Sequence, residues 1–374
     1  MNNGLVVGYL SDIVLYFILF AILHKFYRCP YCYYRKRIFY ATVLIILFCC
    51  FAFFDSDYYG YLNDFTRIFQ YGKTRTSLED FYTWLIPLTS GNYFIFRLLI
   101  WGSATILLVQ TFKIANIGIG ITLFFFVVMN LNIFAYGRVS LVFSILFLSL
   151  AFLLSNKKGT FKKFIAVALL FGALFLHKSA AFGVAIVISA WMLRKAKRDT
   201  MFLFILCIPI LIGAATMFIE YLQTTSNQTT LLDFNSAKGY LSSALVKSGI
   251  GAIIRKILVR TPYYLTAYVY VYSVLQKQNV HWPILVNCFG MASFMIVVSA
   301  SLFLFIDNVN ADTLYYRFLY YSIIPNSVLL AYCYRIRFMP RLVSLALSIG
   351  VTGVIYSLIY GFYNLLLGAN MMRI

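Results

Sequence analysis

The sequence has little charge, and very little of that charge is negative. Only 11% of its 374 residues are charged, and 11 acidic residues stand against 31 lysines and arginines. Because a soluble globular domain carries about 25% charged residues, this composition argues against an ordinary soluble fold. Hydrophobic residues make up 62% of the chain, and they gather in apolar runs of about 20 residues, the length of a transmembrane helix. The composition predicts an integral membrane protein.

The sequence also lacks most signatures of cofactor chemistry. It has no glycine-rich nucleotide-binding loop, which argues against ATP bound by this chain. Of its seven cysteines, only Cys29 and Cys32 form a C-x-x-C. No second pair and no suitably spaced histidine completes a zinc site. A redox pair and a zinc pair remain open here, and we favour two incidental cysteines. The sequence predicts no cofactor and assigns no metal site.

The basic residues are distributed in a way that predicts an orientation. Eighteen of the 31 lie in short segments between apolar runs, all assignable to one side, and Asp199 is the one acidic residue that shares these segments. This is the positive-inside pattern of membrane proteins. A nucleic-acid-binding protein would instead gather its basic residues on one face, so we expect no nucleic-acid partner.

The hydropathy pattern predicts an all-α integral membrane protein of about twelve transmembrane helices, with both termini outside. Residues 1–374 then form a single polytopic domain. The seventh and ninth spans are the least certain, and a re-entrant segment at either would change the count and the side of the C-terminus. The expected spans are 5–24, 38–54, 93–112, 116–135, 139–155, 162–177, 180–193, 201–220, 261–276, 283–306, 314–334 and 342–362.

Two segments on the outer, periplasmic side are longer than the rest, at about 55–92 and 221–260. Within the second, residues 238–258 have the apolar periodicity of an amphipathic helix, with Lys247 and Arg255 on its polar side. Such a helix would lie on the outer leaflet or cover a cavity.

Carboxylates and tyrosines gather at the outer end of the second span. Asp55 and Asp57 are followed by Tyr58, Tyr59 and Tyr61. The carboxylates suit a general base or a metal site, and the tyrosine rings suit stacking on sugar faces. The alternative is an aromatic belt at the membrane interface with a helix cap.

Two arginines are candidate phosphate ligands. Arg138 follows Gly137 in a very short outer hinge, and Arg317 falls about one turn inside the eleventh span. Ionisable groups at membrane depth are costly and are usually functional, and the planar guanidinium binds oxyanions in bidentate fashion. Arg138 could instead contact lipid headgroups, and Arg317 could pair with Asp307 or Asp312. Further arginines expected on the same side are Arg97, Arg255 and Arg260.

His177 is the only one of the three histidines expected outside, because His24 and His281 fall near cytoplasmic ends. An unperturbed imidazole titrates near pH 6.5, which suits proton transfer or phosphate binding. The alternative is an interfacial histidine beside a capping serine, Ser179.

These places also carry a family resemblance. The chain resembles the EpsG-like group of Wzy-type polysaccharide polymerases of bacterial membranes. The matching motifs are D-x-D-Y-Y-x-Y at 55–61, G-R-x-S at 137–140, a basic loop at 156–158, F-x-H-x-S-A at 175–180 and Y-R-x-x-Y-Y at 316–321. Their order and spacing fit, although they cover only some thirty residues, and the region 221–260 carries no match.

The resemblance implies an activity at the outer face of the bacterial inner membrane. A growing glycan would pass from undecaprenyl pyrophosphate onto a lipid-linked repeat unit, with a chain-length co-polymerase as partner. The bundle would resemble C-type glycosyltransferases and O-antigen ligases. In this scheme Arg138 and Arg317 bind the pyrophosphate, and Asp55, Asp57 or His177 deprotonates the acceptor hydroxyl.

Three other functions compete with this interpretation. A flippase for lipid-linked oligosaccharide would need polar groups along a path through both leaflets, and it often carries an inverted repeat. An O-antigen ligase would share the pyrophosphate chemistry and use a different acceptor. A membrane acyltransferase would have His177 as its base.

Overall fold

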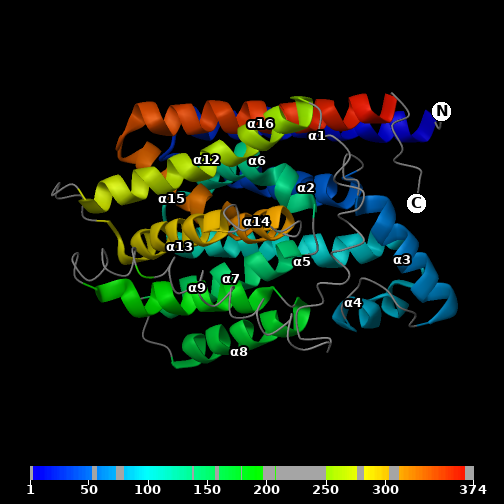
Figure 1. The fold of residues 1–374 in the computed structure, drawn as a ribbon, viewed down its shortest axis with the longest axis horizontal. Helices are drawn as coiled ribbons and strands as arrows, with labels where there is room; N and C mark the ends of the chain where they lie inside the picture. Colours follow the sequence, from blue (N-terminus) through cyan, green and yellow to red (C-terminus); the bar gives the residue numbers. More distant parts are fainter. Residues whose placement is uncertain are drawn as a thin grey trace.

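The structure, a computed structural model, contains helices and connecting turns throughout its described residues. These are residues 3–52, 57–72, 80–136, 139–155, 160–177, 179–196, 207, 250–275, 282–302 and 311–366. Long helices lie side by side and form one bundle, in which the first helix, α1, runs along the last, α16 (Figure 1).

The described helices follow one another along the chain. Their bounds are α1 Asn3–Arg28, α2 Arg35–Phe51, α3 Asp57–Tyr71, α4 Asp80–Leu85, η1 Pro87–Thr89, α5 Tyr93–Ala115, α6 Ile119–Tyr136, α7 Val139–Leu154, α8 Thr160–Leu176, α9 Ala180–Met192, η2 Leu193–Lys195, α12 Ile250–Leu275, α13 Ile284–Leu302, α14 Ala311–Leu319, η4 Tyr320–Ser322, α15 Ile323–Arg335 and α16 Pro340–Leu366.

The described residues confirm the all-helical class, and several of their helices have the length and apolar composition of membrane spans. Within the described residues, four stretches are long and apolar enough to cross a membrane: Gly8–Arg28, Tyr93–Ala115, Ile284–Ser301 and Pro340–Ile359. Ile119–Ala135 and Val139–Leu154 are apolar but shorter. The span expected at 201–220 lies outside the described residues. The count of twelve and the sides of the membrane stay predictions.

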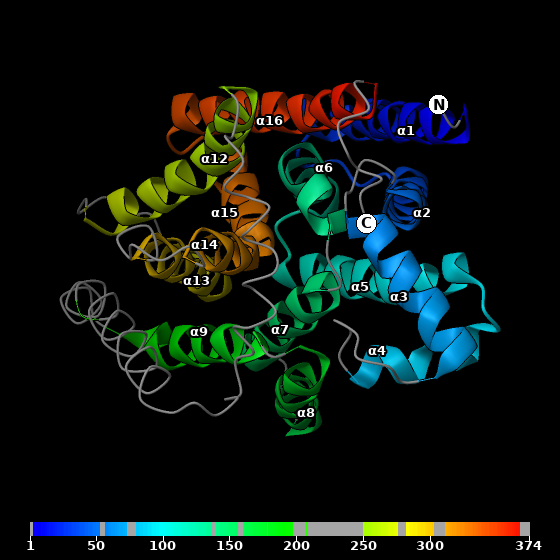
Figure 2. The ribbon, with the colours of Figure 1, turned by 45° about the vertical axis from the view of Figure 1, so that its right-hand side comes forward.

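The central helices differ from the peripheral ones in what they bury. In α7 every residue from Ser140 to Ala151 is buried, as expected for a helix that is apolar on all sides. In α8, by contrast, Phe161, Phe164 and Phe175 are exposed. Figure 2 shows α7 inside the bundle and α8 at its edge. The exposed phenylalanines of α8 are therefore suited to contact lipid.

The helix expected to begin at Thr261 begins earlier, which corrects the predicted boundary. α12 starts at Ile250 and continues through Pro262, so residues 250–258 extend this helix, while 238–249 lie outside the described residues. A proline inside a helix frees the carbonyl four residues earlier, here that of Leu258. Gly353 of α16 packs against this carbonyl, since a Cβ at Gly353 would lie 3.1 Å from the Leu258 oxygen. Close packing by α16 accommodates the proline.

The eleventh predicted span is not one continuous α-helix. It consists of α14, the short 3-10 helix η4 and α15. Ser322 Oγ bonds back to the Leu319 carbonyl at 2.6 Å, and Pro325 removes the N–H that would bond the Tyr321 carbonyl. These local features tighten the chain at Tyr320–Ser322, at the end of the Y-R-x-x-Y-Y motif.

The first long outer segment contains helices that the hydropathy pattern did not predict. α3 is amphipathic and buries Phe65 and Ile68. Phe65 packs its ring 5.3 Å from the rings of both Tyr93 and Phe96 in α5. The segment is therefore folded against the N-terminal part of α5, where α3 lies in both views (Figures 1 and 2).

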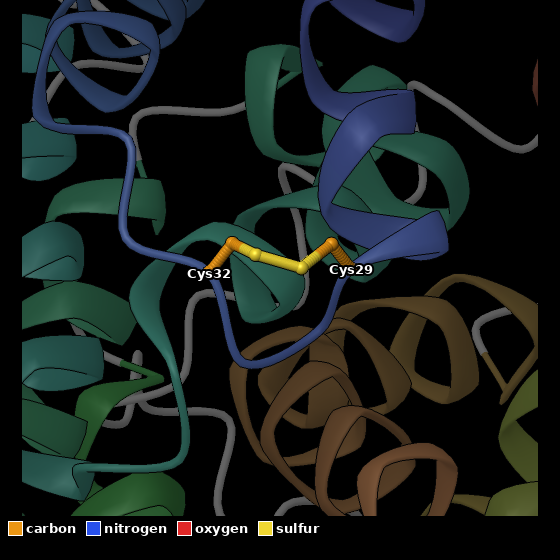
Figure 3. Close-up of a disulfide and its surroundings, with 2 residues drawn as sticks. All are labelled: Cys29 and Cys32. Carbon is orange, nitrogen blue, oxygen red and sulfur yellow. A yellow bond between two sulfur atoms is a disulfide. The ribbon is translucent and has the colours of Figure 1, made fainter.

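The C-x-x-C pair forms a disulfide between Cys29 and Cys32 (Figure 3). The expectation of two incidental cysteines is therefore wrong. The Cys32 N–H bonds the Cys29 carbonyl at 3.1 Å, and this turn brings the Cα atoms to 5.5 Å, within the range that a disulfide bridges. Within the same loop, the Tyr31 hydroxyl donates to the Arg335 carbonyl at 2.8 Å. The disulfide thus closes a loop that contacts the end of α15.

Candidate functional site

The predicted acidic and arginine residues are only partly within the described structure. Asp55 and Arg138 lie outside the described residues. Asp57, Tyr58 and Tyr59 form the first turn of α3, but their side chains lie outside the described part of the chain. The described segments that flank these residues are α2 and α3 for the acidic residues, and α6 and α7 for Arg138.

The other predicted site residues have described side chains. His177 follows the end of α8 and is half-buried, and Arg317 is exposed in the last turn of α14. Tyr61 is half-buried in α3 and packs against the hydrophobic core. His177 and Arg317 belong to segments that meet at Tyr321, whereas Tyr61 belongs to the helix on α5.

Tyr321 links two of the sequence motifs and packs beside a residue that follows a third. It is fully buried in η4. Its ring centroid lies 4.7 Å from that of Phe143 in α7 and 5.6 Å from that of Phe182 in α9. Phe143 follows the G-R-x-S motif by three residues, and Phe182 follows the F-x-H-x-S-A motif by two. Tyr321 itself ends the Y-R-x-x-Y-Y motif.

A hydrogen-bonded chain joins Tyr321 to His177. The Ser179 hydroxyl oxygen lies 2.8 Å from the Tyr321 hydroxyl oxygen and 2.7 Å from His177 Nδ1. The Ser179 backbone N–H also donates to His177 Nδ1 at 3.1 Å. Two motifs that are 142 residues apart in the sequence are thus linked by hydrogen bonds. Ser179, which was considered only as a capping residue, is the bridge.

Gly183 provides the space for the Tyr321 ring. A Cβ at this position would lie 2.5 Å from Cε1 of Tyr321, and Cδ1 of Leu146 would be closer still. Neither distance is compatible with a real side chain. Glycine at 183 therefore lets α9 approach Tyr321 and α7 at the same time.

The hinge that carries Arg138 is closed by the serine of its own motif. Ser140 is buried, and its hydroxyl donates to the Phe134 carbonyl, six residues earlier. The Trp101 indole N–H donates to the same carbonyl at 3.1 Å. Phe134 and Ser140 flank the hinge on its two sides. The last turn of α6 and the first turn of α7 are therefore held together, and they bracket the position of Arg138.

Arg97 lies within the helix packing, where it connects α5 to the C-terminal end of α2. The side chain is fully buried, and its Nε and Nη2 donate to the Cys49 carbonyl at 3.2 and 2.6 Å. Its guanidinium also lies 4.1 Å from the Trp101 ring centroid and donates to the Tyr93 hydroxyl at 3.3 Å. The last carbonyls of a helix lack intrahelical partners, and a cation there also interacts favourably with the helix dipole. Arg97 thus caps α2 just before the acidic motif.

Replacing Arg97 with methionine is expected to destabilise the protein by about 1.5–3 kcal/mol, because the Cys49 carbonyl loses a charged donor in a buried setting. Arg97→Lys should be intermediate, since an ammonium lacks the planar fork. The exposed Arg67 of α3 is the matched control, and Arg67→Met should leave the unfolding temperature in detergent unchanged. Equal unfolding temperatures for the Arg97→Met and Arg67→Met proteins would contradict the capping role.

Asp12 is a buried acidic residue that the sequence analysis did not single out. It lies in α1 and is fully buried. Both Asp12 and Arg97 are close enough to Cys49 to act on it electrostatically. The signal that could have identified it is simple, because Asp12 is the one charged residue within the predicted first span. The interior at this end of the bundle therefore holds both an acidic and a basic side chain.

A second aromatic cluster lies along α14. The guanidinium of Arg260 lies 4.4 Å from the ring centroid of Tyr315 and 4.2 Å from that of Tyr316, distances typical of cation–π contacts. The Tyr264 hydroxyl lies 3.0 Å from the hydroxyls of both Tyr315 and Ser301. Arg260, which was expected only to add to the outer basic residues, therefore joins α12 to the Y-R-x-x-Y-Y motif.

Buried polar bonds also fix the backbone next to Tyr321. Asn130 of α6 donates to the Ile323 carbonyl at 3.2 Å and to the Ser327 hydroxyl at 2.9 Å. Tyr263 in turn donates to the Asn130 side-chain oxygen at 2.8 Å. α6 and α12 thereby hold the start of α15, and with it the position of η4.

Among the described residues, no group of three or more His, Cys, Asp or Glu side chains is placed to hold a metal ion. Asp55 and the Asp57 side chain lie outside that part.

Comparison with known proteins identifies no family. No family model matches the sequence, and there is no significant match among curated proteins or solved structures.

Proposed function

We propose that this chain is a membrane-embedded glycosyltransferase that acts on lipid-linked sugars. More particularly, we propose that it is a Wzy-type polysaccharide polymerase of the EpsG-like group. The observation that carries the proposal is the hydrogen bond between Ser179 of the F-x-H-x-S-A motif and Tyr321 of the Y-R-x-x-Y-Y motif. Phe143, three residues after the G-R-x-S motif, packs on the same tyrosine ring. Motifs that lie far apart in the sequence are therefore neighbours in the bundle.

The proposed reaction extends a glycan by one repeat unit. A hydroxyl of a lipid-linked repeat unit attacks the anomeric carbon of the growing glycan, and the bond from that carbon to undecaprenyl pyrophosphate breaks. The hydroxyl proton passes to a base, for which Asp55, Asp57 and His177 are the candidates. Arg138 and Arg317 neutralise the charge that develops on the leaving pyrophosphate, a contribution that often dominates catalysis. Tyr58, Tyr59 and Tyr61 would hold the sugars.

The proposed setting is the bacterial inner membrane, with twelve spans and the site facing the periplasm. The ends of the helices that carry the motifs support this arrangement. Ser140 and Ser179 lie at the starts of α7 and α9, and His177 lies at the end of α8. These positions fall at one side in the predicted topology. A ligand with a lipid tail, a pyrophosphate and a glycan matches an interfacial site of this kind, and a chain-length co-polymerase would act beside it.

The test is reconstitution with a defined substrate. Purified protein in nanodiscs would receive undecaprenyl-pyrophosphate-linked repeat units from its own host, without nucleotide sugar or added metal. We expect a ladder of glycan lengths that is lost in Arg138→Ala and reduced in His177→Leu. Movement of the substrate across proteoliposomes without a ladder would make the protein a flippase. Transfer only to a lipid A core acceptor would make it a ligase.

A further inference from the structure

We propose that Ser179 and Tyr321 hold His177 as a neutral imidazole with its proton on Nε2, and that this N–H donates a hydrogen bond to a phosphate oxygen of the ligand. His177 would then be a binding residue instead of the general base, with Ser179 and Tyr321 as positioning residues. The identity of the ligand rests on the proposed function. The state of the ring is argued from geometry alone.

One hydrogen-bond donor beside His177 has a fixed role. The backbone N–H of Ser179 points at His177 Nδ1 with a separation of 3.1 Å. A backbone N–H donates and never accepts, so Nδ1 must offer a lone pair to it. In a neutral imidazole one ring nitrogen carries the proton and the other accepts. The proton of His177 is therefore assigned to Nε2 by the hydrogen-bond network.

The same reasoning sets the direction of the two hydroxyl groups. Since Nδ1 has no hydrogen, the Ser179 hydroxyl at 2.7 Å must donate to it. The Ser179 oxygen is then the acceptor for the Tyr321 hydroxyl at 2.8 Å. The chain runs from Tyr321 through Ser179 to His177, and each donor has one defined acceptor. Burial of Tyr321 and its packing on Phe143 fix the far end of the chain.

This arrangement is unsuited to a general base. A base needs a lone pair directed at the substrate hydroxyl, but the lone pair of His177 is directed at Ser179. Nε2 already carries a proton and can only donate. A neutral donor also suits the proposed ligand site, because a protonated imidazole would repel the guanidinium groups that are proposed to bind the same pyrophosphate. The role of the base passes to a carboxylate, Asp55 or Asp57.

The first experiment reads the tautomer directly and does not depend on activity. The chain has three histidines, so 15N labelling of histidine in nanodiscs gives few signals, and His24→Gln and His281→Gln assign them by difference. Between pH 7 and 8 we expect an unprotonated Nδ1 and a protonated Nε2 for His177. Ser179→Ala keeps the backbone N–H but loses the hydroxyl donor, so we expect the Nε2–H tautomer to remain the main one with a smaller excess than in wild type. Tyr321→Phe leaves both Ser179 donors in place and should change this excess less, and Ser179→Thr, which keeps the hydroxyl, should match wild type. A proton on Nδ1 in the wild-type protein would overturn the proposal.

The second experiment separates donation from base catalysis. The side-chain amide of His177→Gln is able to donate a hydrogen bond but not to accept a proton as a base, and His177→Leu does neither. We expect undecaprenyl pyrophosphate to bind His177→Gln within a few-fold of wild type, and His177→Leu about tenfold more weakly, which is 1.4 kcal/mol. Polymer formation should follow the same order. Unchanged binding in both variants, with both rates lowered about 10²–10⁴-fold, is the signature of a base.

The pH dependence of the reaction rate is an additional test, because replacing a residue with only a structural role would not change the shape of the pH profile. If a carboxylate is the base, the acid limb of the profile remains in His177→Gln. If His177 is the base, the acid limb disappears from the profile of His177→Gln, and the residual rate no longer falls as the pH is lowered through it.

The two proposals fail in different ways. If the wild-type protein forms no ladder, the polymerase assignment fails, while the tautomer and pyrophosphate binding still decide the role of His177. If the wild-type protein polymerises but His177→Gln binds as weakly as His177→Leu, the donor role fails and the polymerase assignment stands.

Discussion

Replacing Arg138 with alanine is expected to abolish polymer formation while the protein still inserts into the membrane. The guanidinium would neutralise the pyrophosphate as the glycosidic bond breaks, and loss of one such donor costs about 10²–10³-fold in rate. Insertion should persist because Ser140 and Trp101 both bond the Phe134 carbonyl. The hinge therefore remains closed without the arginine. The measurement is the glycan ladder from purified variants, alongside membrane yield.

Two variants make this experiment specific. Arg138→Lys keeps the charge but loses the bidentate fork, so its rate should lie between those of wild type and Arg138→Ala. Lys113→Ala removes one exposed positive charge from the last turn of α5, and its ladder should be normal. A ladder of normal length and amount from Arg138→Ala would remove Arg138 from the site.

Replacing Gly183 with alanine is expected to impair both stability and activity, although it adds only one methyl group. That group would lie 2.5 Å from the Tyr321 ring, so α9 or Tyr321 must move. Overpacking of this kind costs about 1–3 kcal/mol. Displacement of Tyr321 would also break its hydrogen bond to Ser179 and thereby disturb His177. We expect a lower unfolding temperature and a shortened ladder.

Gly172 provides the matched control in the neighbouring helix. A Cβ at Gly172 meets nothing within 4 Å, and alanine is favoured over glycine in a helix by about 1 kcal/mol. Gly172→Ala should therefore be neutral or stabilising. The packing of Tyr321 against Gly183 would be refuted if Gly183→Ala were as stable and as active as Gly172→Ala.

The positions of the long helices could be predicted from hydropathy because a bilayer imposes a simple rule. Backbone polar groups have no water to bond at membrane depth, so an apolar run of sufficient length forms a helix. The apolar runs at 93–112 and 342–362 accordingly coincide with α5 and α16. The same rule does not fix helix ends, which is why α12 begins before the expected residue and passes through Pro262.

Other features of the fold were not predictable because they depend on neighbours. α3 has too few apolar residues for a span, and it is held by Phe65 packing on Tyr93 and Phe96 of α5. The pairing of Cys29 with Cys32 depends on a turn that brings them together. Spacing alone left a redox pair, a zinc pair and incidental residues open.

In the candidate site, too, some residues could be predicted from the sequence and others could not. The sequence indicated His177 and Arg317 because ionisable groups are rare in this chain, so each one is noticeable. It did not indicate Ser179, Tyr321 or Gly183 as site residues. Serine, tyrosine and glycine are common in membrane helices, and their roles arise from contacts with residues far away in the sequence.

By itself, the sequence determined that the chain forms apolar helices and which few charged residues stand apart from the positive-inside pattern, because both follow from local composition and the cost of burying charge. The tertiary structure alone decided that Arg97 caps α2 inside the packing and that Ser179 and Phe143 meet at Tyr321. Hydrogen bonds and ring contacts need distances of a few ångströms between distant segments. Only the packing of the whole bundle sets those distances.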